Sequence, residues 1–416
     1  MNLDQIIQGM QFAAIYNKNP MNTSDQAREV ITWQFAGSSA PADMQGRFNG
    51  WTALSNSERA EIIAALNHIE SFLNVDFRQV FNSADPDLNL GKVALSGNVA
   101  GLGGYSMSYR GSEILDYDSF AVFDNELNIT NRTSLVLHEL GHALGLKHPF
   151  DDPTVPAGTD SNKYTLMSYT PNPDNGEDSD AMMLYDILAL QDIWGAVDYN
   201  TGNTRYTGKR TDTVDTIWDT GGVDIFDAKN YSTSVDLDLR EGMFSRFGNY
   251  EDVSIAFGVQ IENANGGSGG DRITGNTGAN TVFAHSGNDW IEGLGGGDKL
   301  KGNRGEDIIF GGSGNDKVYG GRGNDTLHGD GGNDMLFGAG GRDTFVFERG
   351  DARDRIKDFK NDVDTLDLTD FNFASVDQAM SFAEQTTKGV VFDFDGGDRL
   401  KLNNAVLGDV ADDLLI

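Results

Sequence analysis

The sequence of 416 residues contains no cysteine. This absence excludes disulfide bonds, zinc sites built on thiolates and cysteine nucleophiles. No segment reaches the roughly 18 consecutive apolar residues of a membrane-spanning helix. The N-terminal residues also lack the basic segment and apolar run of a secretory signal peptide, so none is expected there. The length allows two or three domains.

Positive charge is scarce as well. The chain has 31 lysine and arginine residues against 64 aspartate and glutamate residues, a formal net charge of −33. Such a chain repels phosphates, so nucleic-acid binding is not expected. The same charge opposes compaction unless cations neutralise it. The composition therefore points to bound cations.

Residues up to about 195 have the pattern of an α/β domain. The β-branched and aromatic residues 30–35 predict a strand. Ser55 and Glu58 have the spacing of a capping box that opens a helix. Apolar residues at 62, 66, 69 and 73 then predict one buried stripe, and His68 on this helix is interpreted as a surface or boundary residue.

From Gly266 the sequence changes to nine unbroken units of nine residues, with the pattern G-G-x-G-x-D-x-U-x. Glycines permit the positive φ angles of a tight turn, and a short strand with one inward apolar residue follows. Two units make one coil of a flattened parallel roll, so equivalent residues lie 18 apart in sequence. The inward position eight holds Ile273, Val282, Ile291, Leu300, Ile309, Val318, Leu327, Leu336 and Phe345.

Position six of the repeat carries an acidic residue in every unit but one. Stacked in rows, these carboxylates would repel each other, and hard divalent cations such as calcium would neutralise them. A flexible Gly/Asp-rich linker would need neither the strict period nor the apolar residue. The segment 266–270 also fits the G-x-S-x-G motif of lipases, but that motif needs a strand before it and a helix after it. We therefore interpret it as a repeat turn.

Three of the six histidines fall in HELGHALGLKH, from His138 to His148. The leucines around them predict a helix over residues 133–145, with His138 and His142 one turn apart on one face. Two neutral imidazoles at this spacing can bind one zinc ion. Gly145 lets the chain turn sharply, so His148 can fold back as a third ligand.

Glu139 follows the first of these histidines, so its carboxylate can reach a water molecule on the metal. Three protein ligands leave one position on the metal open for that water. Glu139 can take a proton from the water, and the resulting hydroxide can attack a carbonyl group. A purely structural zinc site would normally close with a fourth strong ligand and would not need this glutamate. The pattern therefore predicts a hydrolytic zinc site.

The stretch resembles the extended zinc signature of the metzincin peptidases. Those enzymes carry a methionine-containing turn beneath the zinc, and Met167, in the segment 164–169, is similar to that methionine. Tyr169 is similar to the tyrosine of the serralysin branch. There the phenol ligates the resting zinc and then moves off to stabilise the transition state. The resemblance implies both roles, zinc ligand and catalytic residue, for Tyr169.

Serralysins, subfamily B of peptidase family M10, join a peptidase domain to a calcium-binding β-roll of RTX repeats. The resemblance covers roughly residues 25–416. It implies an α+β metzincin-like zinc peptidase domain over residues 21–197 and a C-terminal parallel β-roll over 198–416. Residues 1–20 are either a short propeptide that is removed or an N-terminal tail.

Two further segments of the first domain resemble the family. Residues 188–195 look like the helix that closes its peptidase domain. Residues 101–109 lie where it keeps an edge strand that pairs with extended peptide substrate. Gly104, Tyr105 and Ser106 are the predicted substrate contacts of that strand.

The family's calcium ligands are main-chain carbonyls at repeat positions two and four and the carboxylate at position six. Carried over by position, the main-chain ligands are Gly267, Gly269, Gly278, Gly287, Gly296, Gly305, Gly312, Gly314, Gly321, Gly323, Gly332 and Gly341. The side-chain ligands are Asp271, Asn280, Asp289, Asp298, Asp307, Asp316, Asp325, Asp334 and Asp343. Asn280 replaces an aspartate, and Ala284 and Ala339 replace glycines, so sites there are expected to be weak or missing.

Other calcium ligands are implied at both ends of the repeats. Residues 218–224 resemble a further calcium loop, and the roll's entrance and exit supply more candidates. The residues implied are Arg210, Asp212, Asp219, Gly221, Asp224, Gln260, Glu262, Asp351 and Asp354.

Calcium sites of this kind bind at about 10⁻⁴–10⁻³ M, so they would be empty in a bacterial cytoplasm and filled outside. The roll is then expected to fold only after export. Residues 413–416, Asp-Leu-Leu-Ile, are similar to the family's C-terminal signal for a type I secretion transporter. The resemblance thus implies a secreted, extracellular, monomeric protein. Whether a periplasmic inhibitor exists stays open.

The hypothesis favoured by these patterns is a secreted zinc endopeptidase that acts on proteins and peptides, with calcium stabilising the roll. The alternative is a calcium-dependent extracellular binding or adhesion protein with an inactive peptidase-like domain. Intact zinc ligands and Glu139 argue against that alternative. A lipase of the RTX type is disfavoured because its serine motif lies inside a repeat.

Overall fold

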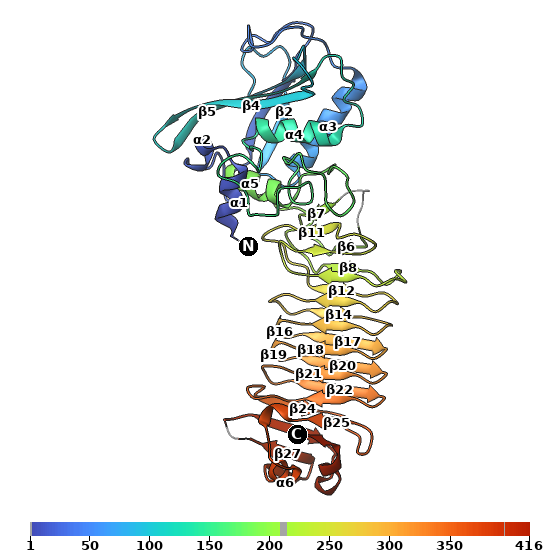
Figure 1. The fold of residues 1–416 in the computed structure, drawn as a ribbon. Coiled ribbons are helices and arrows are strands. Elements are labelled where there is room, and N and C mark those ends of the chain that lie inside the picture. The colour runs from blue at the N-terminus through green and yellow to red at the C-terminus, as the bar shows by residue number, and fades with distance from the viewer. Residues whose placement is uncertain (1, 209–213, 395) are drawn as a thin grey trace. The chain divides into compact units, whose positions relative to one another are not determined.

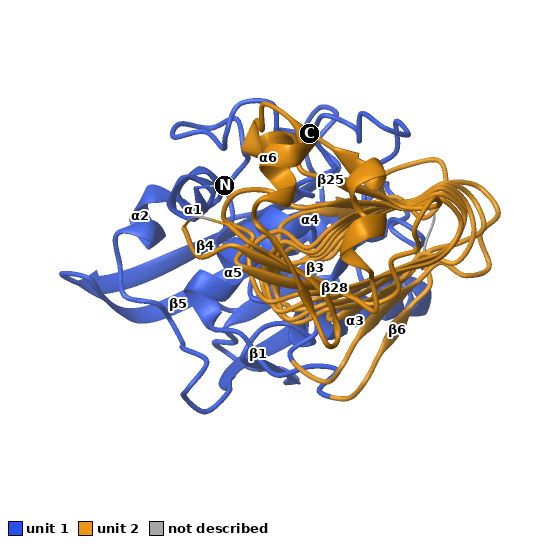
Figure 2. Ribbon diagram, turned by 90° about the horizontal axis from the view of Figure 1, so that it is seen from below, with its two compact units in different colours: residues 1–201, 209–220, 256–258 blue, residues 202–208, 221–255, 259–416 orange. Residues whose placement is uncertain are grey.

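The computed structural model describes residues 2–208, 214–394 and 396–416, which divide into two compact units (Figures 1 and 2). Unit 1 comprises residues 1–201, 209–220 and 256–258, and unit 2 comprises residues 202–208, 221–255 and 259–416. Within the described ranges, no helix is long and apolar enough to cross a membrane.

Unit 1 is built on a mixed sheet with the order β2-β1-β3-β5-β4. The first four of these strands run parallel, and β4 lies antiparallel to β5 at the edge. The predicted strand at 30–35 and the edge position of residues 101–109 are therefore confirmed. The strands are β1 (Glu29–Phe35), β2 (Val75–Gln79), β3 (Leu88–Val93), β4 (Gly101–Arg110) and β5 (Glu113–Asp124).

The helices of unit 1 follow the predicted capping and apolar patterns. At the start of α3 the Ser55 hydroxyl accepts from Glu58 N, and Ser55 N donates to the Glu58 carboxylate at 2.8 Å, which confirms the capping box. The predicted apolar stripe at 62, 66, 69 and 73 is buried, and His68 lies at the boundary. The helices are α1 (Leu3–Met10), α2 (Ala13–Tyr16), α3 (Asn56–Glu70), α4 (Thr133–Ala143) and α5 (Leu184–Trp194).

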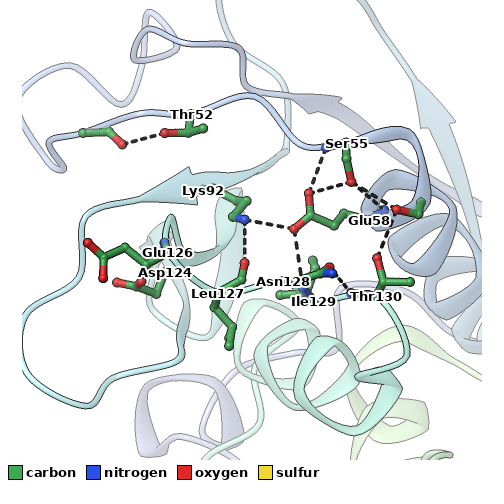
Figure 3. Close-up of polar contacts among 12 residues, drawn as sticks. Thr52, Ser55, Glu58, Lys92, Asp124, Glu126, Leu127, Asn128, Ile129 and Thr130 are labelled. Atoms are coloured by element: carbon green, nitrogen blue, oxygen red, sulfur yellow. Dashed lines mark hydrogen bonds and ion pairs between the residues drawn. The ribbon is translucent and has the colours of Figure 1, made fainter.

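A buried ion pair joins α3 to β3. Lys92 Nζ donates to Glu58 Oε1 at 2.9 Å and to Leu127 O at 2.5 Å, and Ile129 N donates to the same carboxylate (Figure 3). Burial alone would raise the pKa of Glu58, but hydrogen bonds from Lys92 and Ser55 outweigh it and lower the pKa to about 2. The pair fixes the loop that leads into α4.

Unit 2 is a roll of two sheets that face each other, and each sheet contributes a row of inward apolar residues to the interior. The first roll sheet has the order β26-β27-β28-β24-β22-β20-β17-β14-β12-β8-β6, and the second has the order β29-β25-β23-β21-β18-β15-β13-β9. The first contains β6 (Arg205–Tyr206), β8 (Ile225–Asp227), β12 (Asn263–Asn265), β14 (Thr281–Phe283), β17 (Lys299–Arg304), β20 (Lys317–Arg322), β22 (Met335–Gly340), β24 (Arg353–Ile356), β26 (Ala383–Thr386), β27 (Gly389–Asp393) and β28 (Arg399–Asn403). The second contains β9 (Asp236–Asp238), β13 (Arg272–Thr274), β15 (Trp290–Glu292), β18 (Ile308–Phe310), β21 (Thr326–His328), β23 (Thr344–Val346), β25 (Thr365–Asp367) and β29 (Leu414–Leu415).

Short elements occupy the remaining turns and the C-terminal segment. The chain also forms β7 (Asp215–Ile217), β10 (Phe244–Ser245), β11 (Val253–Ile255), β16 (Gly295–Gly296), β19 (Ser313–Gly314), α6 (Val376–Met380) and the 3₁₀ turns Thr369–Phe371, Leu407–Asp409 and Ala411–Asp413.

The roll confirms the predicted coil of two units. Ile273 on β13 lies in register with Ile291 on β15, which lies in register with Ile309 on β18. Every predicted inward residue at position eight is at most 2% exposed. Residues 266–270 form the turn between β12 and β13, so a strand and not a helix follows the G-x-S-x-G sequence, as expected for a repeat turn.

Candidate metal centre

Three imidazoles converge at the C-terminal part of α4. Ligand nitrogens of His138, His142 and His148 all lie within 4.8 Å of one another. The first two come from successive turns of α4. Gly145, with φ of 109°, carries the chain out of the helix, and His148 returns with Nε2 3.1 Å from Nε2 of His142. The predicted cluster is therefore present.

In each of the three rings, Nδ1 lies close to an oxygen acceptor outside the cluster. Nδ1 of His138 lies 3.0 Å from Leu166 O, Nδ1 of His142 lies 2.9 Å from Leu146 O, and Nδ1 of His148 lies 3.4 Å from an Asp151 carboxylate oxygen. In His138 and His142 a main-chain carbonyl accepts the Nδ1 hydrogen bond, and in His148 the Asp151 carboxylate lies beside Nδ1, so the Nε2 lone pair is left for a metal.

The electrostatics of the cluster also suit a metal. Burial lowers the pKa of all three rings, that of His142 to about 3, so they are neutral at physiological pH. Three neutral imidazoles form a donor set that zinc prefers, with room for further ligands. The residues present therefore fit a zinc ion.

Glu139 lies beside this cluster and is 6% exposed. Burial raises the pKa of Glu139 to about 7, against the opposing effect of a hydrogen bond from the main chain of Gly103. A carboxyl group with this pKa can both take and return a proton near neutral pH.

Glycines in β4 allow that strand to approach Glu139. A Cβ atom at Gly103 would stand 2.0 Å from Glu139 O, and one at Gly101 would stand 2.7 Å from the Glu139 carboxylate. Sequence reasoning singled out Gly104, Tyr105 and Ser106 on this strand and missed these two glycines. The unusual G-L-G-G run, residues 101–104, was the signal that could have found them.

Asp186 on α5, which sequence reasoning also missed, supports the segment 164–169. Its buried carboxylate accepts from Thr165 Oγ1 at 2.6 Å, Leu166 N at 2.7 Å and Met183 N at 2.9 Å. Burial raises the pKa of Asp186 to about 6, although these hydrogen bonds lower it. The capping contact with Met183 also explains why α5 begins at Leu184, before the predicted residue 188.

Met167 and Tyr169 lie on opposite sides of the same segment. Met167 is fully buried, and a Cβ atom at Gly141 would stand 2.7 Å from its sulfur, so α4 packs directly on it. Tyr169 is 69% exposed, and its hydroxyl lies 2.8 Å from Nε2 of His148. Burial and the nearby Glu139 raise the pKa of Tyr169.

A cleft of about 670 Å³ lies beside the cluster. It is lined by Gly101 of β4, by Arg132 and Leu135 of the α4 region, and by Leu166 and Tyr169. His138 and Glu139 also face this cleft. The candidate metal centre is thus open to a ligand beside the edge strand.

The repeat aspartates form a second set of candidate metal ligands. One carboxylate oxygen, Oδ1, accepts from the main chain of the preceding coil, as in Asp271 N to Asp289 Oδ1 at 2.7 Å. The other oxygen is buried with no hydrogen-bond donor in Asp289, Asp298, Asp307, Asp316, Asp325, Asp334 and Asp343. Burial raises the pKa of these carboxyl groups, for example to about 8 in Asp289 and about 7 in Asp298.

A buried carboxylate oxygen without a donor is costly to leave unpaired, and a bound cation would satisfy it and hold the group ionised. Calcium fits, because it takes several oxygen ligands in flexible geometry. Two units differ from this pattern. Both oxygens of Asp271 accept from the main chain of Val235 and Gly267, and Asn280 bonds to Asn276 and to Glu262 O.

Comparison with known proteins decides the family. The model of the serralysin C-terminal domain of peptidase family M10 matches residues 189–415. The chain belongs to the serralysin family.

Curated serralysins are similar over about three fifths of their length. Serralysin G of Dickeya chrysanthemi is 30% identical over 282 residues, which cover 59% of each chain. Serralysin of Photorhabdus luminescens is 30% identical over 280 residues, 57% of this chain and 56% of its own. Among solved structures, myroilysin aligns with 41% of this chain and 95% of its own at 15% identity and a TM-score of 0.25, too low to support an argument.

The remaining calcium candidates of this serralysin stay predictions. Asp219 and Asp224 are each 1% exposed, and Glu262 accepts from Asp224 N at 2.6 Å, whereas Gln260 is exposed. Asp354 accepts from Asp334 N, and Asp351 from Glu348 N. Arg210 and Asp212 lie outside the described residues.

The N-terminal helices of this serralysin pack into unit 1. Ile6 and Met10 of α1 are fully buried, and Met10 O accepts from Lys147 N, next to His148, at 2.7 Å. The Phe12 ring lies 5.4 Å from that of Tyr105 on β4. Whether residues 1–20 are removed as a propeptide stays a prediction.

Proposed function

We propose that this member of the serralysin family is a secreted, zinc-dependent endopeptidase that cleaves extended segments of proteins. The observation that carries the proposal is the convergence of three neutral imidazoles beside a buried glutamate, with His138 and Glu139 lining an open cleft. The free edge of β4 borders that cleft. It supports binding of substrate as an additional strand along Gly104, Tyr105 and Ser106.

His138, His142 and His148 would hold the zinc ion. When bound, zinc would act as a Lewis acid on the substrate carbonyl and favour attack by water at neutral pH. Glu139, with its pKa near 7, takes a proton from the attacking water and returns it to the leaving amine. The Tyr169 hydroxyl moves off Nε2 of His148 and donates a hydrogen bond to the carbonyl oxygen as negative charge develops. Met167, packed against Gly141, supports the helix that carries His138 and His142.

A matched pair of glutamate variants tests this mechanism. Glu139→Gln keeps the shape of the side chain but removes the base, so casein hydrolysis should fall at least about 10²-fold with zinc content unchanged. Glu126→Gln changes an exposed glutamate and should leave the rate unaltered. Hydrolysis by Glu139→Gln at the wild-type rate would overturn the assignment.

We further propose that calcium completes the fold of unit 2. The buried, donorless oxygens of the repeat aspartates support this role. A calcium chelator should abolish the sheet signal of the roll in circular dichroism, and Asp307→Ala should raise the calcium concentration needed to restore it. Asp377→Ala, at an exposed position in α6, is the control. An unchanged roll without calcium would contradict the proposal.

Secretion through a type I transporter is the corresponding proposal for localisation. It predicts that the protein accumulates in the culture medium of its host and not in the cells. A protein found only inside the cells would contradict it.

A further inference from the structure

A row of cations lies on the outer surface of the first roll sheet. We define the basic face as Lys299, Lys301, Lys317, Arg355, Lys357 and Lys401. They lie on or directly after β17, β20, β24 and β28, and alternate residues of these strands point inward. Figure 1 shows β17, β20 and β22 following one another along the roll.

Like charges stand directly opposite each other on this face. Lys299 pairs in register with Lys317, and Arg355 pairs in register with Lys401. Slight burial and the neighbouring cations, Arg355 first among them, lower the pKa of Lys401. Among the ion pairs of the described residues, none joins the basic face to a carboxylate. Like charges opposite one another destabilise a sheet, so the face needs a counter-charge from outside the chain.

Aromatic rings hold some of these cations in place. The Lys301 ammonium lies over the rings of Phe283 and Tyr319, 5.3 and 5.1 Å from their centroids. Tyr319 stacks on Phe337 at 4.6 Å, and Lys357 lies over the same Phe337 ring. The faces of the rings are therefore covered, so nucleotide bases would find no surface on which to stack.

The second roll sheet shows that the calcium-binding rows do not require these cations. The strands of both sheets follow repeat aspartates, one set for each sheet, but outward positions of the second sheet carry mainly uncharged residues. They include Trp290, Ile308, Phe310, Thr326, Thr344 and Val346. Arg272 at such a position has its own partner, Glu292, at 3.1 Å. The excess of positive charge is a property of one face alone.

We propose that the basic face binds an extended acidic polysaccharide, a chain of uronate or sulfated sugars. Neighbouring strands are about 4.8 Å apart, so the cations form a line of closely spaced charges that suits a thin polyanion. At physiological salt each charge acts over about 8 Å, so a thin chain lies within the field of the basic face. A planar anionic membrane would also meet the acidic surface of a protein with net charge −33.

The hydrogen-bonding groups of the face also favour a sugar chain over an acidic peptide. The strands that carry it are internal, with main-chain groups paired on both sides. They therefore have no free main-chain N–H and C=O groups with which the backbone of a peptide could pair as an added strand. Ammonium and guanidinium groups supply donors only, which suits a ligand rich in carboxylate, sulfate and hydroxyl oxygens.

Titration of the full-length, calcium-loaded protein with polygalacturonate tests this inference. Wild type should bind, and the affinity should fall steeply between about 50 and 200 mM salt. Lys299→Gln/Lys317→Gln/Lys401→Gln should weaken binding at least about tenfold and flatten the salt dependence. The matched control, Arg272→Gln/Thr326→Gln/Thr344→Gln on the second roll sheet, should bind like wild type.

Several results would overturn the inference. These are absence of saturable binding by wild type, equal weakening in the control, or tighter binding to single-stranded DNA, polyglutamate or phosphatidylserine vesicles. Thermal unfolding with calcium shows whether the triple variant folds. If it does not, Lys317→Gln alone should still reduce the salt slope, and an unchanged slope would refute the proposal. Glu139→Gln protein should bind like wild type, so this test is independent of peptidase activity.

Discussion

Nδ1 of His138 lies 3.0 Å from the main-chain oxygen of Leu166, so the first candidate zinc ligand is oriented by the segment that carries Met167 and Tyr169. The nitrogen of Leu166 in turn donates to Asp186 on α5. The orientation of this candidate zinc ligand thus depends on a buried carboxylate outside the histidine cluster.

Asp186→Asn should weaken zinc binding by about 10- to 100-fold, the usual effect of losing a group that orients a metal ligand. In the wild type both oxygens of the carboxylate accept hydrogen bonds from three donors. The asparagine amide keeps one oxygen as an acceptor and replaces the other by an NH₂ group, which is a donor. The segment 164–169 therefore loses at least one of these hydrogen bonds. Competition with a zinc chelator measures the affinity. Asp198→Asn, at an exposed position, should be without effect. An unchanged affinity in Asp186→Asn would show that the carboxylate serves only folding.

Gly103→Ala should reduce kcat/KM by at least about tenfold. Its new methyl group would stand 2.0 Å from Glu139 O, a main-chain atom, so β4 or α4 must move. Gly37→Ala is the control, because a Cβ atom there meets nothing within 4 Å. Steady-state kinetics on a peptide substrate measure the effect, and normal kinetics for Gly103→Ala would contradict the close approach of the strand to Glu139.

Tyr169→Phe should lower kcat about 10²-fold while KM changes little, because the hydroxyl is assigned to the transition state and not to substrate binding. Tyr199→Phe, also exposed, should behave like wild type. A raised KM with an unchanged kcat in Tyr169→Phe would contradict a role of the hydroxyl in the transition state.

The pair of Glu58 and Lys92 should give unit 1 a specific acid sensitivity. The folded pKa of Glu58 is about 2, below its ordinary 4.5, so its contribution is fully present above about pH 4.5 and is lost as pH falls toward 2. Glu58→Gln should lose about 3 kcal/mol at pH 7, since Lys92 is left buried without its charge partner. The difference from wild type should shrink as pH falls through this range.

Urea unfolding at saturating calcium, from pH 7 to pH 3, measures that difference. The repeat aspartates titrate in both proteins, so they cancel in the comparison. A difference that stays constant with pH would contradict the assigned pKa.

The sequence predicted features that depend on spacing within one element. The period of nine placed the inward residue of each of the nine repeat units, and the spacing of His138 and His142 placed two imidazoles on one helical face. Both follow from the geometry of strands and helices, which fixes the direction of each side chain locally.

Features that depend on which elements meet were not predictable in this way. Gly103 matters because β4 lies against α4, and Asp186 because α5 lies under the segment 164–169. The G-L-G-G run marks Gly103 as unusual but does not identify Glu139 as its neighbour, and nothing near Asp186 in sequence identifies the segment that it supports. The cations of the basic face are dispersed along the sequence. They lie next to one another only because alternate repeat units form different sheets of the roll.

X-ray absorption at the zinc edge of the calcium-loaded protein can establish whether the three histidines bind zinc. We expect one zinc per chain with three nitrogen ligands at about 2.0–2.1 Å, and loss of the site in His148→Ala but not in His68→Ala. Zinc surrounded only by oxygen, or retained unchanged in His148→Ala, would contradict it.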